Sequence, residues 1–228
     1  MDALELTGRA RTHVLQLDEL HAALHHAVVE PFQVLRAAAA REGIELAVFS
    51  SFRDFHAQSA IWNRKYRGER PLYGRDGRPR EHTALDEDEL LDAILLWSAL
   101  PGASRHHWGT DIDVYDRAAM PADYRVQLLP EEYGAGGVFA ELSRWLDTNL
   151  QRSGFFRPYD TDRGGVHPEP WHISYGAVAV PAAAALSVEL LAQALHDAEL
   201  LGKSRVLERL PEIHARFVAN VGRPAPAE

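Results

Sequence analysis

Hydrophobic residues in the N-terminal part of the chain follow two different periods. Leucines at helical spacing predict a helix over residues 13–29, and a proline-started, glycine-ended segment predicts another over residues 31–43. Residues 44–50 instead alternate between apolar and polar side chains, which is typical of a β-strand. We therefore expect two N-terminal helices that lead into a strand.

The next part of the chain is expected to be helical on both sides of a loop. Asp54 is placed to cap a helix to about Tyr66, and the acidic run at residues 86–89 fits the first turn of a helix to Leu100. Residues 67–83 between them are rich in Gly, Pro and Arg, so we expect a long mobile loop. We favour a loop that extends into the solvent without a function of its own. The alternative is a lid that contacts a substrate bearing a carboxylate.

Short strands and one helix are predicted further along. Residues 111–115 alternate polar and apolar side chains, which predicts a strand with both of its aspartates on one face. The irregular residues 117–137 are expected to wall one side of a cleft, and core spacing predicts a helix over residues 138–152. Residues 155–157 and 172–175 are expected to return to the sheet as strands.

Alanine and leucine dominate the chain from Pro181 onward. They predict one helix over residues 181–201 and another over residues 204–221 that is interrupted at Pro211. A helical hairpin that packs on the core, or on a second subunit in a homo-oligomer, is the natural arrangement.

Composition narrows the class of protein. The chain has 228 residues, of which 46% are hydrophobic and 25% charged, which are ordinary values for a globular protein. Its net charge of −9 argues against a nucleic-acid binder, which needs a basic face. Because cysteine is absent, histidine and carboxylate side chains must carry any metal chemistry.

The sequence shows no targeting or membrane segment. The first residues lack a basic region followed by an apolar run, and no stretch approaches the length of a transmembrane helix. We therefore expect a cytoplasmic protein, with export to the periplasm by a route hidden in the sequence as the alternative.

Two short stretches carry the candidate chemistry: residues 101–113, which end in Asp111-Ile112-Asp113, and residues 169–172, which read Glu-Pro-Trp-His. Together they offer two imidazoles and a carboxylate as metal ligands, and one carboxylate that is left free. A catalytic zinc site needs this inventory: three protein ligands, an open position and a base. The helical His-Glu-x-x-His motif of other zinc peptidases is absent, so a different architecture is expected.

Local backbone preferences support a meeting of these stretches. His106 precedes the predicted strand in a turn that contains Gly109, where a bend can bring the imidazole back over the strand. Prolines on both sides of Glu169 favour a polyproline-like backbone, which repeats every three residues. Glu169 and His172 would then project from the same side.

The pattern Ser104-x-His106, six intervening residues and Asp113, with Gly109 between them and Glu-Pro-Trp-His downstream, resembles the VanY-like D-alanyl-D-alanine carboxypeptidase family. This family belongs to the wider group of lysostaphin-type and D-Ala-D-Ala zinc peptidases. Upstream, Ser51-Phe52-Arg53, with Gln58 five residues on, is similar to the arginine segment with which the family binds substrate. The resemblance spans roughly residues 44–176.

The resemblance implies that zinc is bound by His106, Asp113 and His172. Asp111 stands where the family usually has alanine. Two roles remain open for it: replacing Asp113 as a ligand, or hydrogen-bonding a ligand histidine. We favour Asp113 as the ligand on the family spacing.

The resemblance also implies the catalytic and substrate-binding residues. Glu169 would be the general base and later the general acid. Arg53 would hold a substrate carboxylate near the scissile bond, with Gln58 and Ser104 as supporting polar contacts. Ser174 replaces an arginine that often follows the Glu-Pro-Trp-His segment.

The remaining histidines are given other interpretations. Surface or partly buried roles are favoured for most of them, namely His13, His21, His25, His26, His82, His196 and His214. His56 could line the cleft near Arg53, although a role elsewhere is favoured. His107 is expected to point away from His106, and His167 lies within reach of Glu169 in sequence.

These observations predict a zinc-dependent peptidase that hydrolyses a D-alanine-ended, peptidoglycan-type peptide as a D,D-carboxypeptidase or dipeptidase. An endopeptidase or L,D-carboxypeptidase that acts on cell-wall peptides is the nearest alternative. A zinc-containing binding module without turnover is the alternative from another class; Glu169, which has no role in holding metal, counts against it.

The predicted fold class is α+β, with a small antiparallel sheet that carries the zinc site, flanking helices and a C-terminal helical extension. We divide the chain into a zinc peptidase domain with N-terminal helices over residues 1–180, the helical extension over residues 181–222, and a disordered tail over residues 223–228.

Overall fold

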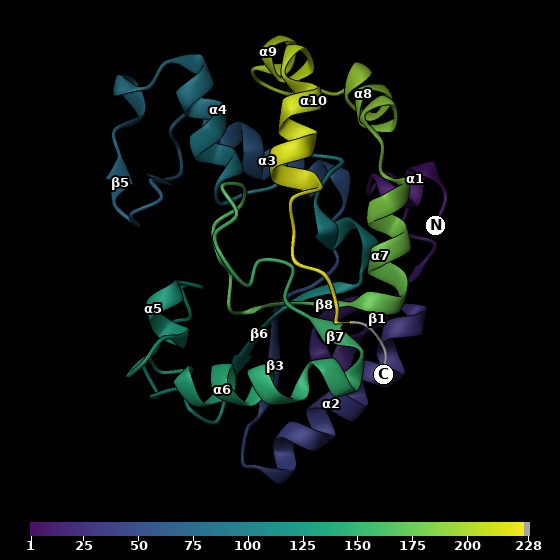
Figure 1. Cartoon of the computed structure of the whole chain (residues 1–228), viewed down its shortest axis with the longest axis vertical. Helices are drawn as coiled ribbons and strands as arrows, with labels where there is room; N and C mark the ends of the chain where they lie inside the picture. The colour runs from purple at the N-terminus through teal and green to yellow at the C-terminus, as the bar shows by residue number, and fades with distance from the viewer. Residues whose placement is uncertain (226–228) are drawn as a thin grey trace.

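A four-stranded antiparallel sheet lies at the centre of the computed structural model, which describes residues 1–225 (Figure 1). The strands lie in the order β3, β6, β8, β7, with the bounds β3 Leu46–Ser50, β6 Asp111–Asp116, β8 His172–Tyr175 and β7 Phe155–Phe156. Every pair of neighbours is antiparallel. The predicted α+β class with a small antiparallel sheet is therefore confirmed.

Helices cover one side of this sheet and form one of two hydrophobic cores. They are α2 (Val29–Arg41), α5 (Pro130–Tyr133) and α6 (Ala140–Asn149), and a 3₁₀ turn, η5 (Gln151–Ser153), follows α6. Figure 1 shows α2 and α6 along the lower side of the strands. Phe32 of α2 and Leu142 of α6 pack with Ile112 and Ile173 of the central strands in this core, and all four are fully buried. Burial of these apolar faces fixes the sheet that carries both motifs.

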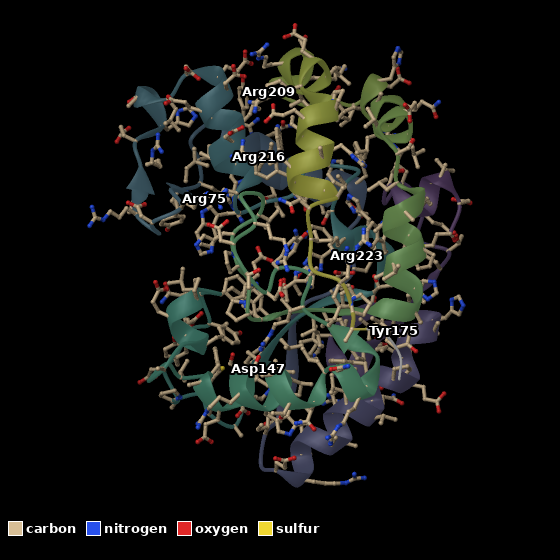
Figure 2. All side chains as sticks on the ribbon, in the orientation of Figure 1. Arg75, Asp147, Tyr175, Arg209, Arg216 and Arg223 are labelled. Atoms are coloured by element: carbon tan, nitrogen blue, oxygen red, sulfur yellow. The ribbon has the colours of Figure 1, made fainter. Side chains whose placement is uncertain are left out.

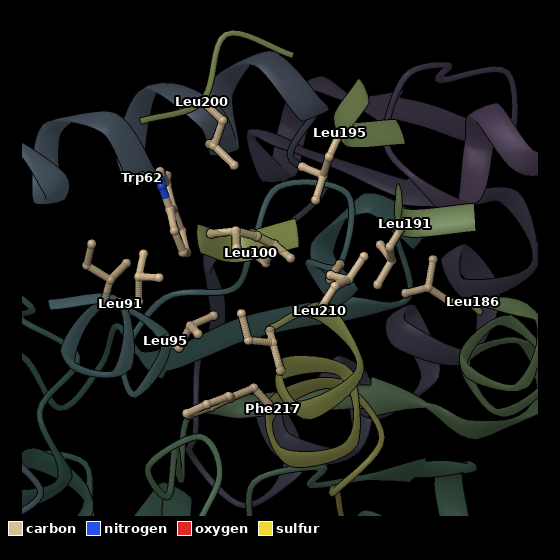
Figure 3. Close-up of a cluster of buried hydrophobic side chains, with 14 of the residues drawn as sticks. Trp62, Leu91, Leu95, Leu100, Leu186, Leu191, Leu195, Leu200, Leu210 and Phe217 are labelled. Carbon is tan, nitrogen blue, oxygen red and sulfur yellow. The ribbon is translucent and has the colours of Figure 1, made fainter. Parts of the chain in front are cut away.

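The second core joins the middle of the chain to its C-terminal extension. It is built on α3 (Phe55–Tyr66), α4 (Glu87–Leu95), α7 (Gly176–Ala185), α8 (Val188–His196), α9 (Lys203–Glu208), α10 (Leu210–Ile213) and a π-helical turn, η6 (His214–Val218). Figure 3 shows Trp62 and Leu91 from the first two helices among Leu191, Leu210 and Phe217 from the extension. The extension therefore packs on the core, which is one of the two arrangements expected for it.

The C-terminal helices are shorter than the apolar run suggests. The one helix predicted over residues 181–201 is two helices in the structure. The first, α7, begins before Pro181 and ends at the cap residue Leu186, and α8 follows it. Ser187 starts α8 because its Oγ accepts a hydrogen bond from the Leu190 amide at 3.2 Å. Residues 226–228 of the predicted disordered tail lie outside the described residues.

The predicted helix over residues 13–29 is wrong. After a short helix, α1 (Ala3–Leu6), this segment forms a hairpin of β1 (Val14–Leu17) and β2 (Ala22–His25), with 3₁₀ turns at η1 (Asp18–Leu20) and η2 (His26–Val28). All four residues of β2 are buried. Its backbone bonds to distant segments, because the His25 amide donates to the Gly109 carbonyl at 2.9 Å and the Ala23 carbonyl accepts from the Phe52 amide at 3.1 Å. These non-local bonds favour a strand over the helix that leucine spacing indicated.

The predicted loop over residues 67–83 contains a small hairpin, which corrects the expectation of a purely irregular segment. Its strands are β4 (Leu72–Tyr73) and β5 (Pro79–Arg80), and a 3₁₀ turn, η3 (His82–Ala84), follows. We call residues 67–81 the arm. Trp97 Nε1 donates to the Tyr73 carbonyl at 3.2 Å, which ties the arm to the chain that follows α4.

Among the described residues, no single helix is long and apolar enough to cross a membrane; α7 and α8 would reach that length together, but they meet at an angle of 77°.

Candidate active site

The two central strands bring the two motifs together. Strands β6 and β8 pair in a register that places Asp113 opposite His172 and Asp111 opposite Ser174. Side chains two residues apart on a strand share a face, so both aspartates face the same side of the sheet as His172. Segments about sixty residues apart in the sequence thus meet because antiparallel strands align them.

His106 reaches this pair from a tight turn. It lies in a 3₁₀ turn, η4 (Arg105–Trp108), that ends at Gly109 with φ of +64°, in the left-handed region. A Cβ atom at Gly109 would come within 2.6 Å of Val14 and 2.7 Å of the His25 amide nitrogen, so no larger residue fits. The turn brings His106 Nε2 to 3.3 Å from Asp113 Oδ2.

These three side chains have the geometry of a metal site. His106, Asp113 and His172 each offer a ligand atom, and these atoms lie within 4.8 Å of one another. His106 Nδ1 and Asp113 Oδ1 are buried without a hydrogen-bond partner in the described part of the chain. Buried polar atoms normally have partners, so a bound ion would account for this cluster. Two imidazoles and a carboxylate suit a divalent transition metal such as zinc, and three ligands leave a position open.

His172 is surrounded by acids. Its Nδ1 lies 3.1 Å from Asp113 Oδ1 and 3.3 Å from Glu169 Oε2, and its Nε2 lies 2.9 Å from Asp111 Oδ1. Burial alone would lower the pKa of His172, but its contacts with these three carboxylates raise it well above its usual value. The cluster therefore favours a positive charge, which either a proton or a metal ion can supply.

Asp111 takes the second of the two roles left open for it. The carboxylate is fully buried and accepts the His172 Nε2 proton. Arg105 Nε and the hydroxyls of Thr110 and Ser174 donate to the same carboxylate at 2.7, 2.6 and 3.0 Å. Burial alone would raise the pKa of Asp111, but Arg105 and His172 hold it well below its usual value. Asp111 thus fixes the tautomer in which Nδ1 of a neutral His172 faces Asp113 with a free lone pair.

Glu169 lies beside the cluster without joining it. A turn in which the His172 amide donates to the Glu169 carbonyl at 3.1 Å brings the two side chains to the same side, as expected. The Glu169 amide donates to the Tyr159 carbonyl at 2.9 Å, and the side chain lines the pocket. Its place, next to the metal-ligand group but outside it, suits a proton carrier.

Arg53 enters the same pocket from the loop after β3. Its Nη1 donates to Gln58 Oε1 at 2.8 Å, and its Nη2 donates to Ser50 Oγ at 3.1 Å. Burial lowers the pKa of Arg53 while Asp113 and Glu169 oppose this shift, so the guanidinium faces the acidic end of the pocket.

Of the two other predicted substrate contacts, one lines the cavity and one does not. Gln58 is fully buried outside the pocket lining, where its Nε2 donates to the Ala99 carbonyl at 2.7 Å and its Oε1 holds Arg53. Ser104 lines the pocket. The structure therefore gives Gln58 the task of orienting Arg53.

A cavity of about 310 Å³ connects these groups. Its lining includes Arg53, Arg70, Trp97, Ser98, Ala99, Ser104, Arg105, His106, Asp113, Gln127, Leu128, Tyr159, Val166, Glu169, Trp171 and His172. The volume lies at the lower end of the range for small-molecule sites, which suits a short peptide end. Gln127 and Leu128 come from the irregular segment expected to wall the cleft.

Sequence reasoning missed three residues of this region. Tyr159 packs edge-on against His172 with ring centroids 5.0 Å apart, and burial raises its pKa to about 12. Arg70 lines the cavity, and Lys65 lies next to it, with Nζ 3.5 Å from the Trp97 carbonyl. No motif marks any of them; the basic character of residues 67–83 was the one available signal for Arg70.

The histidines near the site have structural roles. His107 points away from His106, as expected: its Nδ1 donates to the Arg53 carbonyl at 2.6 Å, its Nε2 accepts from Gly102, and burial lowers its pKa to about 4. His167 stacks on Trp97 with ring centroids 4.1 Å apart rather than contacting Glu169. His56 is exposed and lines a separate groove, so it does not line the cavity around Arg53.

Comparison with known proteins agrees with this geometry. A sequence model of the family described as VanY, D-alanyl-D-alanine carboxypeptidase, matches residues 21–178. An uncharacterized protein of Haemophilus influenzae is 38% identical over 121 residues, which cover 52% of this chain and 92% of that relative.

Two solved structures share the fold. VanYB in complex with D-Alanine-D-Alanine is 22% identical, covers 87% of this chain and 86% of its own, and has a TM-score of 0.50. A vancomycin-resistance D,D-pentapeptidase VanY in complex with Zn(II) is 21% identical, covers 90% of this chain and 92% of its own, and has a TM-score of 0.52. At these identities the likeness concerns the fold.

Because the family model covers more than half of the chain and both motifs, the protein belongs to the VanY family of D-alanyl-D-alanine carboxypeptidases. It is a metallopeptidase of the carboxypeptidase type, as its motifs predicted.

Proposed function

We propose that this protein is a zinc-dependent peptidase that releases D-alanine from the carboxyl end of peptides. One observation carries the proposal: His106, Asp113 and His172 form a metal-ligand group, and Glu169 Oε2 lies 3.3 Å from His172 Nδ1 in the same cavity. Two proteins of the same fold were solved with D-Alanine-D-Alanine and with Zn(II), which supports this choice of substrate and metal.

In the proposed reaction Glu169 moves the proton. Zinc at the ligand group supplies a Lewis acid, which makes a water molecule a stronger nucleophile near neutral pH. The Glu169 carboxylate accepts the proton of that water as it attacks the scissile carbonyl. The same carboxyl group then donates the proton to the leaving amine, which departs as free D-alanine.

Arg53 determines where the peptide is cut. Gln58 and Ser50 each accept one N–H of its guanidinium, and the cation faces the acidic end of the cavity. A free terminal carboxylate bound by this group would place the last peptide bond beside Glu169. Its positive charge would also stabilise the oxyanion that forms in the transition state.

The test is the substitution Glu169→Gln in the zinc-loaded protein. We expect the variant to keep one zinc per chain by metal analysis and to lose at least ~100-fold in D-alanine release from an N-acylated D-Ala-D-Ala peptide, since general base catalysis contributes about 10²–10⁴-fold. Glu131→Gln, at an exposed position of α5, should match the unaltered protein. Full activity of Glu169→Gln would refute the proposed mechanism.

The same assay separates the neighbouring activities. A peptide whose terminal carboxylate is amidated should resist cleavage if Arg53 reads that carboxylate. Cleavage of the amidated peptide would instead identify an endopeptidase, and release from peptides ending in L-alanyl-D-alanine alone would identify an L,D-carboxypeptidase.

A further inference from the structure

Two cations line the catalytic cavity and a third lies beside it, and the proposed reaction uses one of the three. Arg53 and Arg70 line the cavity together with Trp97. The Lys65 ammonium lies 3.5 Å from the Trp97 carbonyl, within electrostatic range of Arg53, Arg70 and Glu169. None of the ion pairs formed among residues 1–225 involves any of these three cations.

Arg70 is held at the cavity by a fixed arm. On the arm, Arg75 Nη1 pairs with Asp162 at 2.5 Å, and its Nη2 donates to the Gly165 carbonyl at 2.9 Å. Figure 2 shows Arg75 projecting from the arm toward the loop that precedes Glu169. Directly after the arm, His82 Nε2 lies 2.7 Å from the carbonyl of Tyr66, the residue directly before the arm. These contacts set the arm against the cavity, so the place of Arg70 follows from the fold.

The nearby acids do not balance this charge. Asp113 faces the two ligand histidines and also acts on Arg53, and Glu169 is the carboxylate that acts on both Arg53 and Lys65, so two carboxylates face three cations and two histidines. The pKa of Lys65 is lowered to about 8: burial is the main cause, Arg70 and Arg53 add to it, and Glu169 opposes it. Like charges that share a site repel one another, and an entering anion relieves that repulsion.

When the substrate binds through one carboxylate, an excess of positive charge remains at the cavity. In the proposed function, which this inference rests on, Arg53 takes the terminal carboxylate. The two terminal alanines carry methyl side chains and offer no second anion. Within the substrate, a second anion can come only from the residues that precede them, and the one directly before them lies nearest to the cut.

We propose that Arg70 and Lys65 form a second carboxylate-binding subsite, which makes the protein selective for peptides in which an acidic residue precedes the terminal pair of alanines. The subsite adds binding energy on the amino side of the cut. It would be screened by salt, because Arg70 is exposed.

The experiment compares two peptides of matched size, N-acetyl-L-glutamyl-D-alanyl-D-alanine and N-acetyl-L-glutaminyl-D-alanyl-D-alanine. With the zinc-loaded protein we expect kcat/KM to favour the glutamyl peptide about tenfold, which corresponds to roughly 1.4 kcal/mol. Arg70→Gln should reduce the ratio toward one by slowing the glutamyl peptide alone. Arg78→Gln is the control, because Arg78 lies on the same arm with an 86% exposed side chain and pairs with Asp76.

Two results would overturn the subsite. One is equal kcat/KM for the two peptides with the unaltered protein. The other is an equal loss on both peptides in Arg70→Gln, which would mean that Arg70 serves the terminal carboxylate.

Binding separates this inference from the proposed function. Calorimetric titration of each peptide into zinc-loaded Glu169→Gln measures its affinity for the subsite in the absence of turnover. Tighter binding of the glutamyl peptide supports the subsite even if the unaltered protein releases no D-alanine, in which case the proposed reaction alone fails. Equal affinity for the two peptides rejects the subsite.

Discussion

The two nitrogens of the His172 ring face different carboxylates, and this difference gives each neighbouring acid its task. Nδ1 faces Asp113 and Glu169, whereas Nε2 is held by Asp111 at 2.9 Å. Asp111 in turn accepts from Arg105, which also donates to Ser174 Oγ at 2.7 Å. Arg105 is itself buried, and Asp111 balances its charge.

Replacing Asp111 with asparagine tests this arrangement. Asp111→Asn keeps the shape but removes the charge that fixes the His172 tautomer, so we expect zinc affinity to fall by about 10–100-fold. Competition with a chromophoric chelator measures this loss directly, without an activity assay.

The matched control for that change is Asp116→Asn. Asp116 is the other buried aspartate outside the ligand group on β6, and its Oδ1 accepts from the backbone amides of Glu45 and Ala118. An asparagine can accept the same bonds, so zinc affinity should be unchanged. Equal weakening in both variants would show that Asp111 acts on the fold rather than on His172.

At the scale of elements, segments governed by local signals agree with the sequence prediction. Asp54 caps α3 through a bond from the Ala57 amide at 2.7 Å, and Asp86 caps α4 in a capping box with Glu89. The alternation of apolar and polar residues also predicted the strands β3 and β6 correctly. The β1–β2 hairpin was missed because its strands are stabilised by bonds to Gly109 and Phe52, and no periodicity within residues 13–29 encodes those partners.

The same hairpin makes stability depend on pH. His25 Nδ1 accepts from the Ala27 amide at 3.1 Å, and its ring lies 4.3 Å from His26 and 5.8 Å from His13, with Glu5 nearby. Burial, aided by the other two histidines, lowers the pKa of His25 to about 4 from 6.5. Because the unfolded chain binds this proton more readily, the stability is complete above pH ~6.5 and is lost as the pH falls through about 4.

His25→Asn should reduce this acid sensitivity. The asparagine Oδ1 can accept the Ala27 amide bond but does not titrate, so the drop in Tm between pH 7 and pH 4.5 should be smaller than in the unaltered protein. The exposed substitution His196→Asn should leave the drop unchanged. If His25→Asn shows the same drop as the unaltered protein, other groups cause the acid loss.

At the scale of the whole molecule, the C-terminal extension holds the loop that leads to Glu169. Arg216 Nε donates to the Gly164 carbonyl at 2.9 Å, and Asn220 Nδ2 donates to the Arg163 carbonyl at 2.7 Å. The Gly222 amide donates to the Pro158 carbonyl at 2.7 Å. Arg216 also pairs with Asp92 of α4 at 2.6 Å, so it joins the helical core to this loop (Figure 2). The extension therefore fixes the segment that leads to Glu169.

Arg216→Gln is expected to loosen that segment. A net hydrogen bond contributes about 0.5–1.5 kcal/mol, so we expect kcat to fall by up to about tenfold while zinc content stays the same. Arg205→Gln removes a similar ion pair to α4, through Asp88 at 2.6 Å, without touching the loop. It should lower Tm at most, with kcat unchanged; equal losses of kcat in the two variants would assign the effect to the helical core.

The sequence by itself determined the chemistry and the local elements. His106, Asp113, Glu169 and His172 could be predicted as candidate site residues because ligand types, glycine and proline act over a few residues, and strand alternation set which side chains share a face. The tertiary structure decided what depends on distant partners: the hairpin over residues 14–25, the role of Asp111 and the approach of Arg70 to the cavity. Those features arise from pairing and packing between segments far apart in the chain, and such contacts leave no periodic trace in the residues that make them.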